Sequence, residues 1–383
     1  MSETNPTLTA LFTDIADAIR EKTGDTATIV ADDFPDVIRE RLQAAPPPPA
    51  YLTFNSPNGF TLKVNDTTKH WNGTLEYSTD TSTWSTWDGT TTLSSATSGS
   101  KNVLYLRGTG NTMITGNSSN YKWVLTGSDI ACIGNIENLL DYATVESGGH
   151  PTMASYCYHS MFRNCTSLIQ APALPATTLA EGCYNDMFDG CTNLTQAPAL
   201  PATTLTTYCY DSMFCNCTNL TQASALPATT LADYCYEYMF YNCTNLTQAS
   251  ALPATTLADN CYYYMFYGCT ALTQAPALPA TTLASYCYNR MFRNCTSLTQ
   301  APALPATTLA DNCYEKMFSG STKIKLSSTQ TGEYTQEYRI PSSGTGTTAT
   351  NALTSMFTST GGTFTGTPKI NTTYYLSNTN AVV

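Results

Sequence analysis

The sequence predicts a multidomain α+β protein whose largest part is an α/β solenoid. A 26-residue motif recurs almost unchanged through the middle of the chain, and its first cysteine returns in every unit from Cys157 to Cys313. Repeats of this length are typical of solenoids, in which each unit buries its apolar face only against its neighbours. Residues 7–22 have helical periodicity, and residues 51–130 have the alternating pattern of short strands. We therefore expect several folding units within the 383 residues.

Residues 1–45 are predicted to form a small helical module. Four apolar residues fall on one stripe of its first helix: Leu8, Leu11, Ile15 and Ile19. Gly24 follows as a helix stop, and a second short helix is expected to begin near Asp33. The prolines of residues 46–50 predict a stiff linker, which would hold this module away from the rest of the chain.

Residues 51–130 predict an immunoglobulin-like β-sandwich. Short period-two segments such as Phe60–Val64 and Val103–Leu106 follow one another at close spacing, with turn residues between them. All four tryptophans of the chain lie here: Trp71, Trp84, Trp87 and Trp123. They either fill a small core, which is the favoured interpretation, or are exposed to bind a ligand such as a carbohydrate.

Residues 131–321 are predicted to form the solenoid, and residues 322–383 its C-terminal cap. In one unit, Cys287, Met291, Phe292 and Cys295 fall on one face of a predicted helix. These positions barely change between units, as expected for side chains that stack on their own copies. Two segments resemble degenerate units and are expected in the end caps: Asn135–Leu140 and Ser355–Phe357.

The fifteen cysteines are predicted to be reduced and buried. The two cysteines of one unit are eight residues apart on the predicted helix, roughly 12 Å, which is too far for a disulfide. Equivalent positions of successive units form a column along the solenoid. Cysteines of one column would lie about 5 Å apart on neighbouring units, so a disulfide between units is the alternative. Free cysteine packs as a small hydrophobe, which favours a buried ladder of thiols.

The columns that vary between units define a candidate binding surface on the outward face of the predicted helix. Six tyrosines in or next to these columns are expected to form a contiguous aromatic patch with two arginines at its edge: Tyr234, Tyr238, Tyr241, Tyr263, Tyr264, Tyr267, Arg290 and Arg293. Two interpretations remain open: these exposed positions drift freely, or they serve recognition, for which Tyr and Arg are favoured. A Thr-Gln ladder from Thr195 to Gln300 is expected on the opposite face, either as hydrogen-bonded spacers or as a sugar-binding surface.

Composition and charge argue against several functions. Charged residues make up 12% of the chain and the net charge is −11, whereas nucleic-acid binding needs clustered Lys and Arg. No segment has the ~20 apolar residues that span a bilayer, so no membrane insertion is expected. The three histidines (His70, His150 and His159) are scattered, and no nucleophile–base pair, metal-ligand spacing or phosphate loop is evident. We therefore expect no enzyme activity, no cofactor and no metal.

The repeat text Met-Phe-x-x-Cys-Thr-x-Leu-Thr resembles the BspA-like class of bacterial leucine-rich repeats, whose units read similarly around Ala-Phe-x-x-Cys-x-x-Leu. The resemblance covers roughly residues 131–321. The unit here is slightly longer than that family's usual unit. Proteins of that class are mostly surface adhesins, so the resemblance implies a leucine-rich-repeat fold that presents a binding surface.

Residues 15–24 (Ile-Ala-Asp-Ala-Ile-Arg-Glu-Lys-Thr-Gly) and 31–35 (Ala-Asp-Asp-Phe-Pro) resemble the N-terminal segment of tail-associated structural proteins from phages of gut bacteria. This resemblance is short. It implies that residues 1–45 attach the chain to other tail proteins of a virion, with the repeats projecting outward.

Together these patterns predict a phage virion adhesion protein of the tail-fibre or tail-tip type that binds a glycan or protein on the host cell surface. The alternative is a bacterial cell-surface leucine-rich-repeat adhesin. Residues 1–6 lack the basic and apolar regions of a signal peptide, which favours a virion protein assembled in the host cytoplasm. The receptor, the host and the formation of a homo-oligomer remain open.

Overall fold

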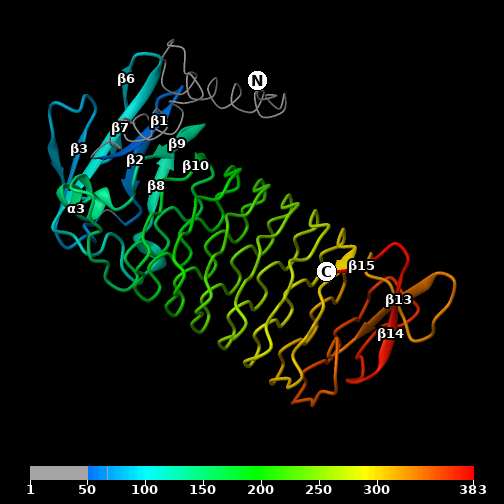
Figure 1. Cartoon of the computed structure of the whole chain (residues 1–383). Helices are drawn as coiled ribbons and strands as arrows, with labels where there is room; N and C mark the ends of the chain where they lie inside the picture. Colours follow the sequence, from blue (N-terminus) through cyan, green and yellow to red (C-terminus); the bar gives the residue numbers. More distant parts are fainter. Residues whose placement is uncertain (1–50, 67) are drawn as a thin grey trace, which may run out of the picture. The chain divides into compact units, whose positions relative to one another are not determined.

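The computed structural model describes residues 51–66 and 68–383, which belong to one compact unit, Ala50–Val383 (Figure 1). The predicted helical module at residues 1–45 and the predicted linker at residues 46–50 lie outside the described residues. Short strands and turns dominate the described residues. Its helices are one α-helix, α3 (Asn138–Glu146), and one 3-10 helix, η2 (Ser119–Tyr121).

The N-terminal part of this unit consists of two largely antiparallel sheets. Their strands are β1 (Leu52–Ser56), β2 (Thr61–Val64), β3 (Thr74–Ser78), β4 (Ser85–Trp87), β5 (Leu93–Ser94), β6 (Ala96–Ser98), β7 (Lys101–Thr109), β8 (Trp123–Thr126), β9 (Ile130–Ile133) and β10 (Leu168–Gln170). The larger sheet has the order β10-β9-β1-β7-β3-β4, with β6 paired to β7, and the smaller one has the order β5-β2-β8. Aromatic rings join the two sheets, because the Trp123 ring centroid lies 6.5 Å from that of Phe54 and 5.4 Å from that of Trp87.

Two layers of strands agree with a sandwich in outline, but the immunoglobulin-like topology is not confirmed and stays a prediction. Trp71, Trp87 and Trp123 are buried, so the core interpretation is confirmed for three of the four tryptophans. Trp84 is half-buried, and the Arg107 guanidinium lies 4.1 Å from its ring centroid.

The larger sheet continues into the solenoid. β9 pairs in parallel with β10 of the first coil, with Leu168 opposite Ile130. Further along, the Ile136 N–H donates to the Ala173 carbonyl at 3.1 Å. Ile136 and the first residues of α3 are buried, so residues 130–140 cover the N-terminal end of the stacked coils. This is the capping role expected for Asn135–Leu140.

The predicted helix of the repeat is wrong, because each unit has a run of consecutive tight turns in its place. Within residues 156–165, the N–H groups of residues 159, 161, 163 and 165 donate to carbonyls three residues earlier. The N–H groups of the even-numbered residues donate instead to the next coil, as Tyr158 does to the Cys183 carbonyl at 2.9 Å. Neither set is the i to i−4 pattern of an α-helix.

A left-handed residue at every fourth position explains why no helix forms. In one unit, Tyr286, Arg290 and Asn294 have φ angles of 58°, 56° and 62°. Residues with positive φ cannot continue a right-handed helix. The four-residue spacing of Cys287, Met291 and Cys295 resembles the helical period of 3.6, so the sequence pattern fits both structures. The predicted core positions are nevertheless confirmed, because these side chains are buried.

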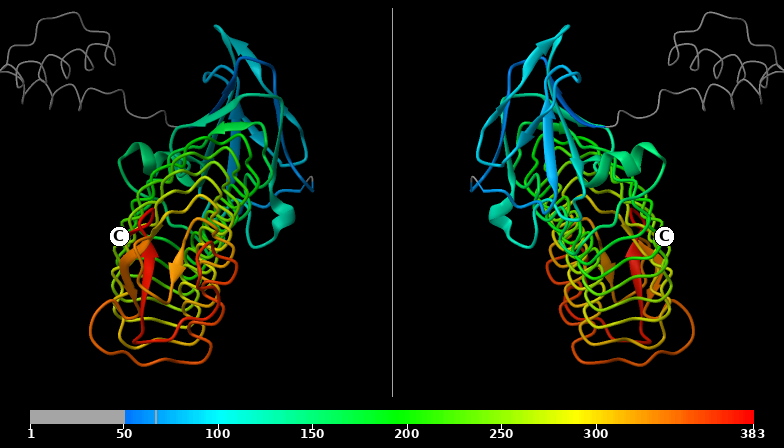
Figure 2. Two further views of the ribbon diagram at one scale, coloured as in Figure 1. Left: turned by 90° about the vertical axis from the view of Figure 1, so that its right-hand side faces the viewer. Right: turned by 90° about the vertical axis from the view of Figure 1, so that its left-hand side faces the viewer.

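Identical side chains stack along the solenoid, whose coils appear in Figure 2 as flattened loops one behind another. Successive rings from Phe162 to Phe318 have centroids 5.6–5.8 Å apart. A second column from Tyr158 to Tyr314 is buried and stacks at the same spacing. All fifteen cysteines are free thiols in this structure, and all but Cys215 are buried, which confirms the predicted burial.

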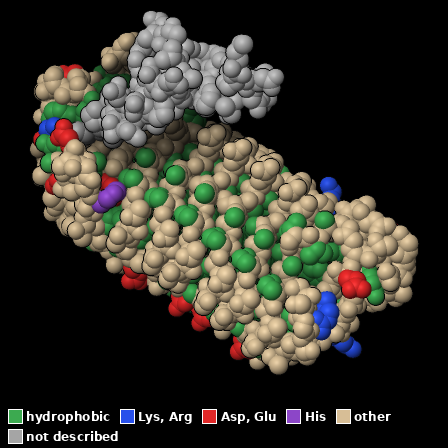
Figure 3. Space-filling view, in the orientation of Figure 1, with side chains coloured by type: hydrophobic (Ala, Val, Ile, Leu, Met, Phe, Trp, Pro, Cys, Tyr) green, Lys and Arg blue, Asp and Glu red, His purple; other side chains and the backbone are tan. Residues whose placement is uncertain are grey.

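The Thr-Gln ladder lies on an exposed extended segment and is bonded from coil to coil. Parallel bridges join Gln196, Gln222 and Gln248. The N–H and the hydroxyl of Thr247 both donate to the Thr221 carbonyl, at 3.3 and 3.4 Å. These contacts fit the interpretation of the ladder as hydrogen-bonded spacers. The solenoid face seen in Figure 3 carries its hydrophobic side chains as separate spots in regular rows, not as one continuous apolar area.

The residues after the last full unit pack against the C-terminal end of the stack. The Phe357 ring stacks on that of Phe318 with centroids 5.4 Å apart, which confirms that Ser355–Phe357 continues the repeat pattern. The remaining strands are β11 (Gln300–Ala301), β12 (Leu326–Ser327), β13 (Tyr334–Arg339), β14 (Thr373–Ser377) and β15 (Ala381–Val382). β12, β14 and β13 form a three-stranded sheet, and β15 pairs with β11 of the solenoid.

Candidate functional site

Seven of the eight predicted surface residues lie together on three consecutive coils. We call them the tyrosine–arginine surface: Tyr238, Tyr241, Tyr263, Tyr264, Tyr267, Arg290 and Arg293. All seven are half-buried. The turns that replace the predicted helix still direct these side chains outward, because two inward residues alternate with two outward ones along the turns.

The surface is built from two parallel stacks that run from coil to coil. In the first stack, Tyr238 and Tyr264 have ring centroids 5.1 Å apart, and the Arg290 guanidinium lies 5.4 Å from the Tyr264 centroid. The second stack repeats this arrangement. Tyr241 and Tyr267 have centroids 4.7 Å apart with planes at 4°, and the Arg293 guanidinium lies 5.7 Å from the Tyr267 centroid. Each stack is thus two phenol rings followed by a cation, an arrangement that cation–π attraction favours.

The two stacks contact each other, because the Tyr264 and Tyr267 ring centroids lie 5.3 Å apart, and further contacts support each stack. Tyr263 meets Tyr264 edge to face with centroids 4.5 Å apart, and its hydroxyl accepts a 3.3 Å hydrogen bond from Arg290. The Tyr267 hydroxyl accepts a hydrogen bond from Asn294 at 3.1 Å. These contacts hold the rings in one arrangement before any partner binds.

Tyr234 does not belong to this surface, although the sequence grouped it there. Its ring stacks instead on Tyr208 of the preceding coil, with centroids 4.7 Å apart. Tyr286, which the sequence did not single out, contacts Tyr263 at 6.2 Å between centroids and is 38% exposed.

Three residues of the surface occupy left-handed backbone positions. Tyr238, Tyr264 and Arg290 have φ angles of 50°, 55° and 56°. Such a conformation is uncommon for bulky residues and costs of order 1–3 kcal/mol each. Other coils place Ser160 and Ser212 in the same column. Stability of the coil therefore does not require tyrosine or arginine there.

The hydroxyls of Tyr238, Tyr241 and Tyr263 remain protonated at neutral pH. Burial, and then the neighbouring phenol Tyr263, raise the pKa of Tyr238 above its ordinary value of about 10. Burial likewise raises the pKa of Tyr241 and of Tyr263. These groups can therefore both donate and accept hydrogen bonds to a partner.

Two carboxylic acids next to this surface have raised pKa values. Asp211 and Glu237 occupy the same column on adjacent coils. Burial raises the pKa of Asp211 to about 7, and burial together with the Asp211 charge raises the pKa of Glu237 to about 8. Asn185 and Ser212 donate hydrogen bonds to the Asp211 carboxylate at 3.0 and 2.8 Å. Both acids fall in a variable column of the sequence, and only the stacking of the coils brings them together.

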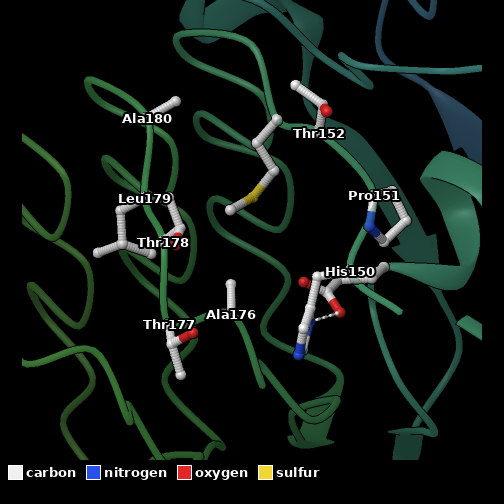
Figure 4. A pocket seen from close by; sticks show the side chains of 10 residues that line it. His150, Pro151, Thr152, Ala176, Thr177, Thr178, Leu179 and Ala180 are labelled. Atoms are coloured by element: carbon white, nitrogen blue, oxygen red, sulfur yellow. Dashed lines mark hydrogen bonds and ion pairs between the residues drawn. The ribbon is translucent and has the colours of Figure 1, made fainter. Parts of the chain in front are cut away.

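A cavity of about 260 Å³ near the N-terminal end of the solenoid was not predicted (Figure 4). Residues 150–153 and residues 176–180 line it, together with Glu137. The Glu137 side chain is fully buried, and its Oε2 lies 2.8 Å from His150 Nδ1, the contact dashed in Figure 4. Glu137 Oε1 has no hydrogen-bond partner among the described residues. No sequence signal pointed to this cavity, because its walls come from different coils.

The histidines do not gather into one site. Each lies beside a different acid: His70 by Asp66, His150 by Glu137 and His159 by Asp186. Across residues 51–66 and 68–383, no group of three or more His, Cys, Asp or Glu is placed to hold a metal ion. A search of the same residues finds no helix with the length and hydropathy needed to cross a membrane.

A stack of near-identical coils with a variable outward surface defines a repeat protein of the leucine-rich class. A family model described as BspA type leucine rich repeat region (6 copies) matches residues 145–273 and 229–338, together just over half of the chain. The chain therefore belongs to the BspA type leucine-rich repeat family, and this domain suggests a protein-binding or adhesion role. No curated protein and no solved structure matches the chain. The predicted repeat family is thus confirmed, whereas the resemblance of the N-terminal segment to phage tail proteins stays a prediction.

Proposed function

We propose that this protein is an adhesion protein whose tyrosine–arginine surface binds a glycan or protein on a cell surface. The observation that carries this proposal is the gathering of five tyrosines and two arginines on three coils. The same columns hold residues such as Ser212 and Asp189 on other coils. Tyr and Arg supply much of the binding energy in protein interfaces, and rigid aromatic residues bind with little loss of conformational entropy.

The backbone adds a second argument. Tyr238, Tyr264 and Arg290 lie in left-handed positions, where bulky residues reduce stability. The same column holds Ser160 and Ser212 on other coils, so folding does not require a bulky residue there, which supports a role of these three side chains in binding. The proposed role is binding without catalysis.

We further propose that the surface serves a phage virion of the tail-fibre or tail-tip type. Residues 1–45 would attach the chain to other tail proteins, and the virion would assemble in the host cytoplasm. The resemblance at residues 15–24 and 31–35 supports this assignment. A bacterial cell-surface adhesin built on the same repeats is the alternative, and the repeat family fits both equally.

The test replaces the tyrosines of the surface and measures adsorption to host cells. Asn is suited to the left-handed positions (Tyr238→Asn, Tyr264→Asn), and Ser to the other three (Tyr241→Ser, Tyr263→Ser, Tyr267→Ser). The control variant carries five substitutions on the ladder: Thr195→Ser, Thr221→Ser, Thr247→Ser, Thr273→Ser and Thr299→Ser. We expect the tyrosine variant to stay folded and lose adsorption while the ladder variant adsorbs normally. Normal adsorption of the tyrosine variant with loss of adsorption in the ladder variant would show that the Thr-Gln ladder is the binding surface.

A further inference from the structure

Arg293 is a cation of the tyrosine–arginine surface that lacks an acidic partner. Arg290 bonds to Glu315 Oε1 at 3.1 Å, as well as to Asn289 and Tyr263. Arg293 lies over the Tyr267 ring and has no hydrogen bond or ion pair from its side chain to any other residue that the structure describes. Its Nε is buried without an acceptor. Arg290 Nε is buried without an acceptor in the same way, so the two arginines differ at their terminal nitrogens. Those of Arg290 pair with Glu315, Asn289 and Tyr263, whereas those of Arg293 have no acceptor among the described residues and can take one from a partner.

The same column offers a direct comparison. At its other end, Arg163 Nε donates to Asp189 Oδ2 of the next coil at 2.9 Å. The coil after Arg293 places Ser319 where the coil after Arg163 places Asp189. Two arginines in equivalent positions therefore differ in their pairing: Arg163 has an internal carboxylate, whereas Arg293 has none and lies over the Tyr267 ring.

The stacked rings favour an anion over a neutral sugar at this point. Because the members of each stack lie on successive coils, Tyr264 and Tyr267 are covered on both faces, by another tyrosine and by an arginine. Their edges and hydroxyls remain for a partner, and ring edges carry the positive end of the aromatic quadrupole. Together with the Arg293 guanidinium they form a locally positive point on a chain of net charge −11.

We propose that Arg293 and the adjoining tyrosines recognise the carboxylate of an Asp or Glu side chain on a protein partner. This inference rests on the proposed function of the surface and specifies its partner. Guanidinium pairs with carboxylate in a bidentate geometry, and Tyr and Arg dominate the centres of protein–protein interfaces. A single unpaired guanidinium matches one carboxylate better than it matches a polymer with repeated phosphates.

The experiment selects binders from a displayed library of random short peptides on the full-length protein. Dissociation constants of the enriched peptides are then measured for the wild type, Arg293→Ala, Arg293→Lys and the matched control Arg163→Ala. We expect the enriched peptides to contain Asp or Glu. Loss of a charge-assisted pair should weaken their binding about tenfold or more in Arg293→Ala, with partial recovery in Arg293→Lys and little change in Arg163→Ala. Thermal melting verifies that each variant is folded.

Three results would overturn the inference: enriched peptides without acidic residues, equal losses in Arg293→Ala and Arg163→Ala, or Arg293-dependent binding of carboxylate-bearing oligosaccharides without any peptide binding. The last result would assign the surface to an acidic glycan. The failure of this inference is distinguishable from the failure of the proposed function. If the five-tyrosine variant loses cell adsorption while Arg293→Ala keeps it, the surface binds a partner but not through this carboxylate contact.

Discussion

One column of the repeat shows how a single backbone angle restricts the residue type. In the seven full units, the third left-handed position of the turns holds Asn or Gly, in the order Asn164, Gly190, Asn216, Asn242, Gly268, Asn294 and Gly320. These two residues adopt positive φ most readily. At Gly268 an added Cβ would lie 2.3 Å from Asn242 Oδ1 of the preceding coil, so the glycine also makes room for that amide.

This column predicts the effect of two substitutions at Gly268. Gly268→Ala should lower the free energy of unfolding by roughly 1–2 kcal/mol, because Ala disfavours positive φ and its Cβ would contact the Asn242 amide. Gly268→Asn should lower it less, since Asn216 and Asn242 already share a hydrogen bond on adjacent coils. Denaturant unfolding measures both values. An Ala variant as stable as the wild type would refute the backbone explanation.

The acid pair Asp211 and Glu237 predicts a pH dependence of stability. Because their pKa values in the folded state are raised to about 7 and about 8, the folded state holds these protons more firmly than the unfolded chain does. Their contribution is fully present below the unfolded pKa values near 4 and is lost as pH rises through the folded ones. Thermal melts should therefore show falling stability from about pH 5 to about pH 8, and Asp211→Asn combined with Glu237→Gln should flatten that slope. An unchanged slope in the double variant would assign the effect to other groups.

At the scale of the element, side-chain direction could be predicted from the sequence but backbone conformation could not. Cys287, Met291 and Cys295 repeat every four residues, which suits both an amphipathic helix and a run of turns with a left-handed residue in each. Seven of the eight predicted residues therefore lie together on outward positions, without Tyr234, and their role in binding stays a prediction. The Glu137 cavity and the acid pair depend on how coils stack, and no pattern within one unit shows that.

Stacking of equivalent coils predicts that whole units can be removed. Deleting residues 183–208 removes one repeat and joins equivalent positions, so the Phe and Tyr columns and the hydrogen bonds between coils should re-form. The shortened protein should unfold in one transition with moderately lower stability, and it should keep the binding surface. Deleting residues 183–195 removes only half a unit and should prevent cooperative folding. Circular dichroism with thermal unfolding compares the two, and equal behaviour would contradict nearest-neighbour stacking.

For the whole molecule, the proposal assigns attachment to residues 1–45 and recognition to the tyrosine–arginine surface of the solenoid. A chain that begins at Tyr51 retains the sheets, the solenoid and the cap, so it should fold and bind its partner. Under the phage proposal it should not enter particles, because residues 1–45 are expected to contact the other tail proteins. Particle composition by immunoblot reports the outcome. Normal incorporation of the truncated chain would refute the anchoring role.

The most direct test of the central claim asks which face of the solenoid touches the partner. A photoreactive benzoylphenylalanine replaces Tyr241 in one variant and Thr247, an exposed ladder residue of the same coil, in another. Each variant is bound to intact host cells, illuminated and analysed for covalent adducts. The proposed function predicts adducts from position 241 and none from position 247. Adducts from position 247 alone would show that the Thr-Gln ladder, not the tyrosine–arginine surface, contacts the cell.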